Sequence, residues 1–144
     1  MDIDPKEAFW HVPFTKLLGV RREFSEGGRA RLVVDPRPDL LNPIQALHGG
    51  VVATLADVVM ASAAVSRIGF TRTAVTLSMH IGYLAPGRGR LTADGEVLEV
   101  HDGVAHCQAV VMADDGQCVA RAAGSFRYLD HAATRPQPTQ ETCS

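Results

Sequence analysis

Apolar residues follow two different periods along this chain. From residue 47 to residue 65 they occupy nearly every position, which is the pattern of a helix that is buried on all sides. We place this helix at residues 49–68, with Gly69 as its stop. In segments such as residues 75–83 apolar and polar residues alternate, and this period of two is typical of strands.

The alternating segments predict strands at residues 20–24, 29–34, 71–83, 90–100, 104–113 and 117–129. Turn signals separate them, so we expect the first two to form a hairpin and the last four a meander of neighbouring strands. In the first strand of the meander, one face is expected to carry Val75, Leu77, Met79, Ile81 and Tyr83. A first helix is predicted at residues 5–17, with Asp4 as its cap and apolar contacts from Phe9, Trp10, Phe14, Leu17 and Leu18.

One long apolar helix and about six antiparallel strands predict an α+β domain. The sheet must wrap the helix in such a domain, because nothing else in the chain can cover it. Residues 1–130 form a single domain in this interpretation. Residues 131–144 are polar, contain prolines and show no period, so we expect a disordered tail there.

Composition and charge argue against several partners. The net charge of -2 over 144 residues is spread along the chain without a basic stripe, so neither nucleic acid nor an anionic membrane is an expected partner. Three cysteines form no metal-binding motif and no even disulfide framework, which favours a reducing cytoplasm. No signal peptide is recognisable, and the apolar run contains an acid, so we expect a soluble cytoplasmic protein.

One carboxylate lies in the middle of the apolar helix. An Asp side chain is almost never fully buried unless it forms an ion pair or takes part in function, so the position of Asp57 in an apolar helix requires an explanation. The same helix begins with His48-Gly49-Gly50, where backbone N–H groups have no partner inside the helix and the dipole favours negative charge. The stretch therefore holds a candidate base and a candidate oxyanion site.

These two groups are too far apart to act on one carbonyl group within one chain. Nine residues separate His48 from Asp57, which corresponds to roughly 13 Å along a helix axis and about half a turn. Two antiparallel helices related by a two-fold axis bring each Asp57 near the other subunit's helix start. A catalytic pair therefore predicts a symmetric dimer with two equivalent sites.

An ordered motif spans this region: Asn42, then His48-Gly49-Gly50, then Asp57, then a strand that contains Thr76 and ends in Tyr83-Leu84-Ala85-Pro86-Gly87. It resembles the hotdog-fold acyl-CoA thioesterases of the phenylacetate-degradation (PaaI-like) group, over residues 40–129 by motif and before that by layout only. The resemblance implies a five- or six-stranded antiparallel sheet around a central helix, assembled as dimers and commonly as tetramers. It also implies hydrolysis of an acyl- or aryl-CoA thioester to a carboxylic acid and CoA, without a metal or a cofactor.

The resemblance also implies roles at matching positions. The amide of Gly49 or of Gly50, with Gly49 favoured, would stabilise the oxyanion that develops on the thioester carbonyl. Asp57 of the other subunit would act as general base or as nucleophile. Asn42 would hold the water or the carbonyl, His48 would shape the helix start, and Thr76 would hydrogen-bond the water or Asp57. Each of these residues also has a plain structural explanation as a helix, cap, packing, turn or strand residue.

Gly50, Ala61, Arg88 and Arg90 are the candidate substrate-binding residues. Gly50 offers a second amide at the helix start, and the small residues from Ala61 onward allow room for an acyl group. Arg88 and Arg90 flank a turn and are of the type that binds CoA phosphates, although a solvated loop is the favoured explanation for both.

Two other functions use the same fold. A non-catalytic acyl-CoA binding or sensing protein would bind the thioester without hydrolysing it, and usually has an added DNA-binding segment. A hydratase or dehydratase would need an Asp and His pair at a different spacing. We recognise neither feature in the sequence.

Overall fold

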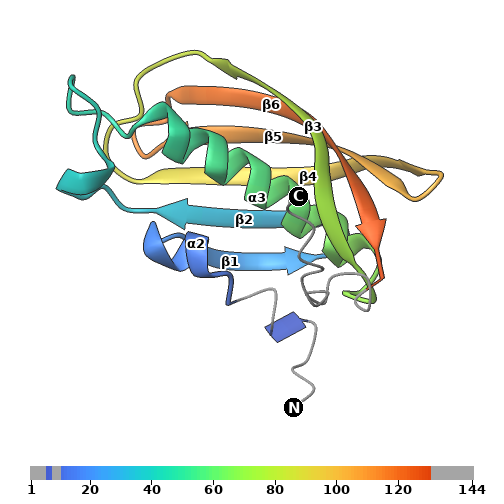
Figure 1. Cartoon of the computed structure of the whole chain (residues 1–144). Helices are drawn as coiled ribbons and strands as arrows, with labels where there is room; N and C mark the ends of the chain where they lie inside the picture. Colours follow the sequence, from blue (N-terminus) through green and yellow to red (C-terminus); the bar gives the residue numbers. More distant parts are fainter. Residues whose placement is uncertain (1–5, 8–10, 131–144) are drawn as a thin grey trace, which may run out of the picture.

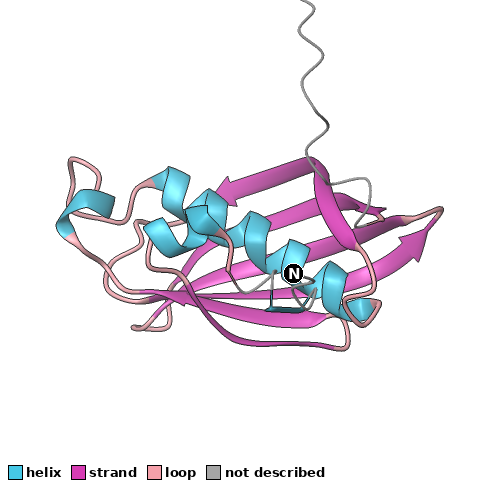
Figure 2. Ribbon diagram, turned by 60° about the horizontal axis from the view of Figure 1, so that its bottom comes forward, coloured by secondary structure: helices cyan, strands magenta, loops and turns pink. Residues whose placement is uncertain are grey.

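The computed structural model describes residues 6–7 and 11–130. In this part of the chain the elements are α2 (Pro13–Leu17), β1 (Arg21–Glu26), β2 (Arg29–Val34), a 3-10 turn η1 (Pro38–Leu40), α3 (Gly49–Arg67), β3 (Thr73–Tyr83), β4 (Leu91–His101), β5 (Val104–Ala113) and β6 (Cys118–Leu129). The strands form one six-stranded antiparallel sheet, and α3 lies across one face of it (Figures 1 and 2). The predicted α+β class and hotdog arrangement are confirmed.

The start of the chain differs from the prediction of one helix at residues 5–17. Val12 is extended, with φ -72° and ψ 120°, and α2 begins only at Pro13. A residue before proline is pushed out of the helical region, whereas proline itself fits the first helical position. Phe14 and Leu17 are exposed, so the apolar contacts predicted for them are wrong. The predicted cap Asp4 and the contacts Phe9 and Trp10 lie outside the described residues.

The order of strands in the sheet is β1-β2-β4-β5-β6-β3. The first two strands form the expected hairpin, and β4, β5 and β6 are consecutive neighbours. The prediction that β3 neighbours β4 is wrong, because β3 pairs with β6 at the far edge. After β3 the chain stays beside β6, where the Leu84 amide donates to the Val119 carbonyl at 2.8 Å. Alternation identifies a strand but not its neighbours, and a turn signal does not require a hairpin.

The alternation in β3 is interrupted by a bulge. Thr76 pairs with Phe126 and Ser78 pairs with Ser125, so Leu77 is an extra residue and is 52% exposed. Beyond such a bulge, side chains that simple alternation would place on one face of the sheet point to the other face. Thr76 therefore lies on the face of the buried Phe126, and the prediction that Val75 to Tyr83 share one face is wrong.

The middle of the sheet presents small residues to α3. Ala30, Gly95, Ala109 and Ala122 are paired side by side across β2, β4, β5 and β6. A Cβ atom added at Gly95 would lie 2.8 Å from the carbonyl oxygen of Val59. The backbone of α3 thus approaches the sheet most closely at β4. By length and composition alone α3 could cross a membrane, but it is mostly buried inside the domain.

This close approach can be tested by adding one methyl group. Gly95→Ala is expected to lower the free energy of unfolding by about 1–3 kcal/mol, because α3 must move away from the sheet. Chemical denaturation measures this difference. Gly82→Ala is the matched control, since the same methyl in β3 would meet its nearest atom only at 4.0 Å. Equal stability of the two variants would contradict the proposed close approach.

Candidate active site

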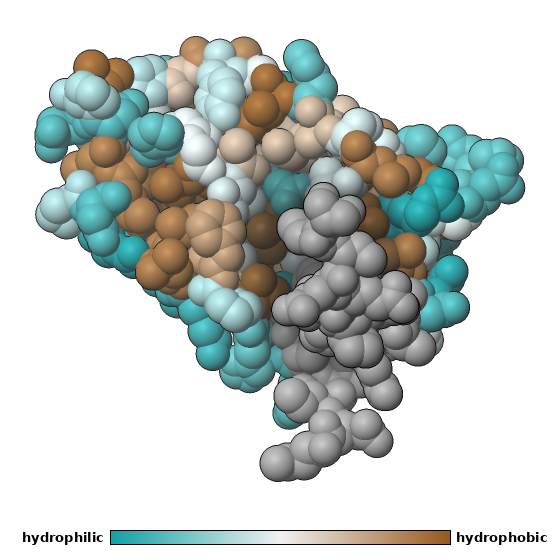
Figure 3. All heavy atoms as spheres, viewed as in Figure 1, coloured by the Kyte–Doolittle hydropathy of each residue, from teal (hydrophilic) through white to brown (hydrophobic). Residues whose placement is uncertain are grey.

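The sheet leaves one stripe of α3 partly open. Between residues 51 and 61 the half-buried positions are Ala53, Thr54, Asp57, Val58 and Ala61, and the others are buried. Residues three and four apart lie along one line of a helix, so these positions form a continuous stripe. Figure 3 views the molecule from this side and shows hydrophobic side chains gathered on this face. The expectation that the sheet covers the helix on all sides is therefore wrong, and Asp57 reaches the surface along the stripe.

Asp57 is held by a residue of the neighbouring edge strand. The Thr76 hydroxyl donates a hydrogen bond to Oδ1 of Asp57 at 2.6 Å. The bulge in β3 makes this contact possible, because it places Thr76 on the face that looks toward α3. One carboxylate oxygen is thus engaged by Thr76, and the contact expected between these two residues is present.

The start of α3 is capped by His48. Its Nδ1 accepts a hydrogen bond from the amide of Gly50 at 2.8 Å. A ring nitrogen that accepts carries no proton, so the ring proton of the neutral imidazole lies on Nε2. The Gly50 amide, one of the two candidate oxyanion donors, is consequently engaged inside the protein.

The amide of Gly49 is the donor that the helix start offers to a ligand. The next amides, of Val51 and Val52, both donate to the carbonyl of His48 at 2.9 and 3.2 Å. Within residues 6–7 and 11–130, no hydrogen bond from the Gly49 amide is present. A helix N-terminus with such an amide is suited to an oxyanion.

Tyr83 holds the same turn from the other side, and the sequence interpretation gave it no role. Its hydroxyl donates to the carbonyl of Gly49 at 2.8 Å. The peptide group between Gly49 and Gly50 is therefore fixed at its carbonyl by Tyr83 and at its N–H by His48. The available signal was the place of Tyr83 at the end of the Thr76 strand, but a strand tyrosine is ordinary and indicates no contact by itself.

Asn42 closes the loop that leads to α3. Its side-chain oxygen accepts hydrogen bonds from the amides of Ile44 and Ala46, both at 3.1 Å. The loop includes Gln45, whose φ of 64° lies in the left-handed region. The structure thus shows the turn role of Asn42, and its contact with water or substrate stays a prediction.

A cavity of about 360 Å³ adjoins this end of the helix. It is lined by residues of the motif and by four aliphatic residues outside it: Asn42, Ile44, Leu47, Gly49, Val52, Tyr83, Leu84, Ala85, Pro86, Gly87 and Val119. Asn42 and Gly49 therefore face one space, whereas Asp57 does not line it. The cavity can receive a ligand whose carbonyl oxygen meets the Gly49 amide.

The predicted site residues thus fall into two groups on one helix. Asn42, His48 and Gly49 lie at its start, and Asp57 lies with Thr76 near its middle. The helix is continuous from Gly49 to Arg67, so Gly49 and Asp57 are separated by roughly 12 Å along the axis. One chain therefore does not bring the two groups of predicted site residues together.

The remaining predicted substrate-binding residues have protein partners or lie on the stripe. Nε of Arg90 donates to the Asp35 carboxylate at 2.7 Å, and this contact helps to hold the pKa of that carboxyl below its usual value. Nη1 of Arg88 donates to the carbonyl of Ile44 at 2.9 Å. Ala61 is half-buried on the open stripe. Binding of CoA phosphates by the two arginines stays a prediction.

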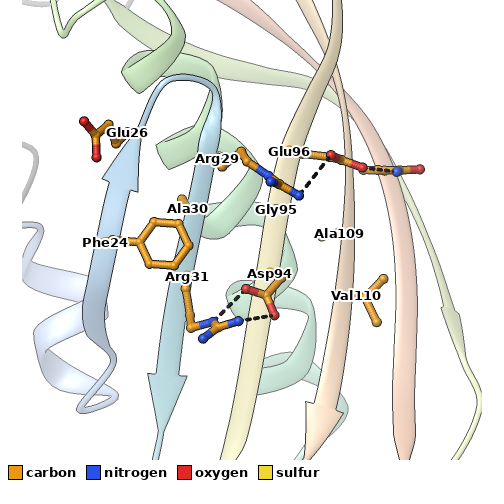
Figure 4. A pocket seen from close by; sticks show the side chains of 11 residues that line it. Phe24, Glu26, Arg29, Ala30, Arg31, Asp94, Gly95, Glu96, Ala109 and Val110 are labelled. Carbon is orange, nitrogen blue, oxygen red and sulfur yellow. Dashed lines mark hydrogen bonds and ion pairs between the residues drawn. The ribbon is translucent and has the colours of Figure 1, made fainter.

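A larger hollow, of about 670 Å³, lies elsewhere. It lies over β1, β2, β4 and β5, and Figure 4 shows α3 behind these strands. Four of its charged side chains form two ion pairs, Arg31 with Asp94 at 2.8 Å and Arg29 with Glu96 at 3.9 Å, and Gln108 also donates to Glu96. None of the predicted site residues lines it.

No group of three or more His, Cys, Asp or Glu side chains that could hold a metal ion occurs in the described ranges. Cys107 is buried, and its burial raises the pKa of the thiol to about 12. Such a thiol is inert at neutral pH.

Comparison with protein families identifies the family. The family model described as the thioesterase superfamily matches residues 45–120, just over half of the 144 residues. The chain belongs to the thioesterase superfamily. The matched stretch contains Gly49, Asp57, Thr76 and Tyr83, so both groups of predicted site residues lie within the family region. The resemblance to the PaaI-like hotdog thioesterases is confirmed.

Two curated relatives support this membership. A protein of Halobacterium salinarum that is provisionally named an esterase is 35% identical over 123 residues, which are 78% of this chain and 82% of the relative. The medium/long-chain acyl-CoA thioesterase YigI of Salmonella typhimurium is 29% identical over 136 residues, 81% of this chain and 86% of the relative. Hydrolysis of a thioester is the activity that these comparisons support.

Solved structures share the fold. The conserved protein PA5202 of Pseudomonas aeruginosa superposes with a TM-score of 0.80 at 28% identity, covering 85% of this chain and 98% of that chain. The PaaI protein of the E. coli phenylacetic acid degradation operon gives a TM-score of 0.79 at 24% identity, over 86% of this chain and 89% of that chain. At that identity the PaaI likeness shows the fold alone.

The hydrogen bond from Tyr83 to the helix start gives a prediction for this thioesterase. Tyr83→Phe removes only the hydroxyl, so the Gly49–Gly50 peptide group loses one of the two side-chain hydrogen bonds that fix it. We therefore expect kcat to fall about tenfold. The measurement is steady-state release of CoA from an acyl-CoA, with KM determined separately.

Tyr128→Phe is the matched control for this change. The Tyr128 hydroxyl donates to the carbonyl of Ala64 near the other end of α3 and is buried. Its loss is expected to lower the melting temperature while leaving kcat near the parent value. Equal effects of the two variants on kcat would show that the Tyr83 hydroxyl has no special role.

Proposed function

We propose that the protein is an acyl-CoA thioesterase whose sites form between two subunits. The observation that carries this proposal is the pair of half-sites on α3: a Thr76-bound Asp57 on an open stripe, and an unused Gly49 amide about 12 Å away. Neither half performs the reaction alone, because a base without an oxyanion donor leaves the developing charge unstabilised. An antiparallel partner helix supplies the missing half to each site.

The nature of the substrate is supported by the relatives. The Salmonella typhimurium protein is named a medium/long-chain acyl-CoA thioesterase. A hypothetical thioesterase from Streptococcus pneumoniae with the same fold, at a TM-score of 0.70 and 22% identity, was solved with coenzyme A. We therefore propose a CoA thioester as the substrate, with its carbonyl at the Gly49 amide.

The proposed reaction is addition of water followed by loss of the thiolate. Asp57 of the partner subunit accepts a proton from water through Oδ2, since Oδ1 is engaged by Thr76. The water oxygen bonds to the thioester carbon, and the carbonyl oxygen becomes an oxyanion bound by the Gly49 amide. When the carbonyl re-forms, the C–S bond breaks and the CoA thiolate takes up the proton held by Asp57, which restores the carboxylate. The products are the carboxylic acid and free CoA.

Direct attack by the same carboxylate oxygen is the other mechanism that this geometry permits. It passes through a mixed anhydride on Asp57, which water then hydrolyses. A single turnover in water labelled with oxygen-18 detects the anhydride when water hydrolyses it at the Asp57 carboxyl carbon, because the label then enters the Asp57 side chain, whereas the general-base route puts all of the label in the product acid.

The edge strand β3 is the proposed dimer contact. It lies at the end of the sheet, so its outer side has no strand partner in the described chain. Val75 and Leu77 expose 42% and 52% of their surface there, and an exposed apolar edge is a ready template for pairing with another strand. Two β3 strands paired antiparallel would continue the sheet across a two-fold axis and set the two α3 helices antiparallel. A tetramer would join two such dimers.

Asp57→Asn tests the base. The amide keeps the shape and the ability to accept from Thr76 but cannot take a proton, so kcat is expected to fall by at least about a hundredfold. Release of CoA is measured over a panel of aryl and straight-chain acyl-CoAs. Unchanged turnover would exclude Asp57 as the reacting group, and binding without hydrolysis by the parent would favour the sensing function.

Gly49→Pro tests the oxyanion donor. Proline removes the N–H, fits the first helical position, and suits the extended His48 before it, whose φ and ψ are -55° and 140°. The variant is expected to fold and to lose about a hundredfold or more in kcat. Gly49→Ala is the control, because it keeps the N–H while its added Cβ lies 3.4 Å from the Tyr83 ring. Equal loss in both variants would assign the effect to crowding.

Mixing the two inactive variants tests the site between subunits. In a dimer of one Asp57→Asn chain and one Gly49→Pro chain, one site keeps both intact halves and the other site loses both. Random reassortment is expected to restore about one quarter of the parent activity, since half the dimers are mixed and half their sites are intact. Activity that stays at the level of the separate variants would show that each site lies within one chain.

A further inference from the structure

The two edges of the sheet differ in how well they are protected against pairing with another strand. β1 forms one edge and β3 the other (Figure 1). Four of the six residues of β1 are charged, whereas the eleven residues of β3 include no Asp, Glu, Lys, Arg or Pro. Charged side chains, prolines and short length are features that keep natural edge strands from pairing. β3 is therefore the edge that a second copy of the chain can extend, with a regular segment from Ser78 to Tyr83 beyond the bulge at Leu77.

Alternate residues of this regular segment turn their backbone groups outward. The Leu84 amide donates to the Val119 carbonyl at 2.8 Å, and the pairing of β3 with β6 has no shift from Ser78 to Tyr83. In an antiparallel ladder every second residue forms its hydrogen bonds to the same neighbouring strand. Every second residue counted back from Leu84 therefore bonds to β6. The residues between them turn their N–H and C=O groups away from the sheet: Met79, Ile81 and Tyr83.

The two half-sites limit where a two-fold axis between two β3 strands can pass. Tyr83 donates to Gly49 and Thr76 donates to Asp57, so β3 carries one contact to each half. An axis that brings Gly49 of one chain level with Asp57 of its partner passes midway between the two halves. A shift of the axis by one residue moves the partner strand by two residues, or roughly 7 Å. Only one or two positions of the axis therefore leave the amide and the carboxylate on the same thioester.

The middle of this stretch lies at His80 or beside it. Thr76 and Tyr83 are opposite positions 126 and 120 of β6, and position 123, halfway between these, pairs with His80. Tyr83 reaches Gly49 through a long side chain, which moves the middle toward Thr76 by up to one residue. The half-sites therefore place the axis at His80 or at Met79.

The outward backbone groups decide between these two positions. With His80 opposite the partner's His80, Met79 lies opposite the partner's Ile81, and both residues have outward groups that form ladder hydrogen bonds. With Met79 opposite itself, Ile81 would meet the partner's Leu77, where the bulge disrupts the ladder. The axis at His80 thus gives two regular hydrogen-bonded pairs where the axis at Met79 gives one.

The exposed apolar side chains of β3 agree with an axis at His80. Leu77 and Tyr83 lie three residues to either side of His80, so each is opposite the other in the partner chain. They expose 52% and 53% of their surface in the single chain. An aromatic side chain opposite an aliphatic one is a favourable cross-strand pair. This register therefore gives both exposed side chains an apolar neighbour.

We infer that two chains pair through β3 with His80 at the two-fold axis, and that this register sets Leu77 of each chain against Tyr83 of its partner. The inference rests on the proposed shared site and deepens it. Tyr83 holds the carbonyl of Gly49, and Leu77 directly follows Thr76, which holds Asp57. The interface therefore joins the support of the oxyanion donor in one chain to the support of the base in the other. Leu77 acts as a positioning residue for the reaction.

Cysteine substitutions locate the axis. His80→Cys places two thiols opposite each other in a pair without backbone hydrogen bonds, where the Cα atoms are roughly 4.5 Å apart. Met79→Cys and Ile81→Cys are the neighbouring controls, and all three variants also have Cys118 and Cys143 replaced by serine. Under mild oxidation His80→Cys is expected to form covalent dimer at least about tenfold faster than either control, because a disulfide needs closely spaced Cα atoms. Non-reducing electrophoresis measures the rates.

The neighbouring controls make this experiment decisive. Faster linking of Met79→Cys or of Ile81→Cys would place the axis at another residue and overturn the inference. Absence of covalent dimer from all three variants would also overturn it.

A mixed pair of variants checks the register away from the axis. Ser78 lies opposite the partner's Gly82 in this register, and both precede or follow His80 by two residues. Chains with Ser78→Cys and chains with Gly82→Cys, distinguished by a tag, are expected to link to each other when mixed and not to link to themselves. Linking of either variant to itself in preference to the other would contradict the register.

The linked His80→Cys dimer tests whether this register is the active one. His80 is exposed and alternates with Met79 and Ile81, which pack against the core, so its side chain lies on the face of the sheet away from α3. The linked dimer is therefore expected to keep kcat within about twofold of the parent value. Activity that is lost on linking and restored by reduction would overturn the inference.

Leu77→Ala tests the positioning role within the linked dimer, which cannot dissociate. The change removes the side chain opposite Tyr83, so kcat is expected to fall about threefold or more with little change in KM. Leu98→Ala is the matched control, because Leu98 is likewise the extra residue of a bulge, in β4, and exposes 60% of its surface. Equal kcat in the two variants would overturn the role of Leu77.

Disulfide formation and hydrolysis are independent measurements, so the inference and the proposed function can fail separately. If His80→Cys chains link as expected but the parent protein hydrolyses no acyl-CoA, the proposed function fails and the register stands. If the parent hydrolyses acyl-CoA but His80→Cys chains do not link, the register is wrong and the thioesterase function stands.

Discussion

A curved sheet can cover only part of the circumference of a helix, and the part left uncovered on α3 determines where chemistry can occur. The small residues around Gly95 let the helix backbone lie directly on the sheet, which fixes the rotation of the helix about its axis. That rotation turns Asp57 to the open stripe and Leu55 and Val59 to the core. The position of the acid is thus a consequence of packing on the opposite side of the helix.

The second constraint is the distance between the Gly49 amide and Asp57, which the rise per residue of the helix sets. The Gly49 amide must lie at the helix start, because only there is an amide without an intrahelical partner. Asp57 lies two turns further on, beside Thr76. No change of rotamer removes this separation, so association of two chains serves the chemistry itself in the proposed function and is more than a source of stability.

Elements with a strong period were predictable from the sequence, whereas relations between elements were not. The helix at residues 49–68 and the six strands follow from local hydrophobic patterns, and the structure has α3 at Gly49–Arg67 and six strands. The neighbour of β3 depends on long-range pairing, which no local pattern records. The bulge at Leu77 is one extra residue in a strand whose alternation continues on both sides, so the sequence contains no sign of it.

The candidate site shows the same limit. Asp57 was predictable because an acid in an apolar helix is anomalous, and its contact with Thr76 was expected from the family motif. Which of the two adjacent glycine amides is left for a ligand depends on which one His48 caps, and only the atomic geometry shows that it caps Gly50. Tyr83 is an ordinary strand residue by type, and only its contact with α3 distinguishes it.

The place of β3 at the edge beyond β6 also has a consequence for the order of folding during synthesis. β3 leaves the ribosome before β4, β5 and β6, yet among the strands of residues 11–130 it pairs only with β6, the last of them to be made. Contacts between distant segments form late because loop closure must come first. The nascent chain therefore displays both edges of β3, which is a hazard for aggregation, and Thr76 reaches its native position beside Asp57 only when the final strand has emerged.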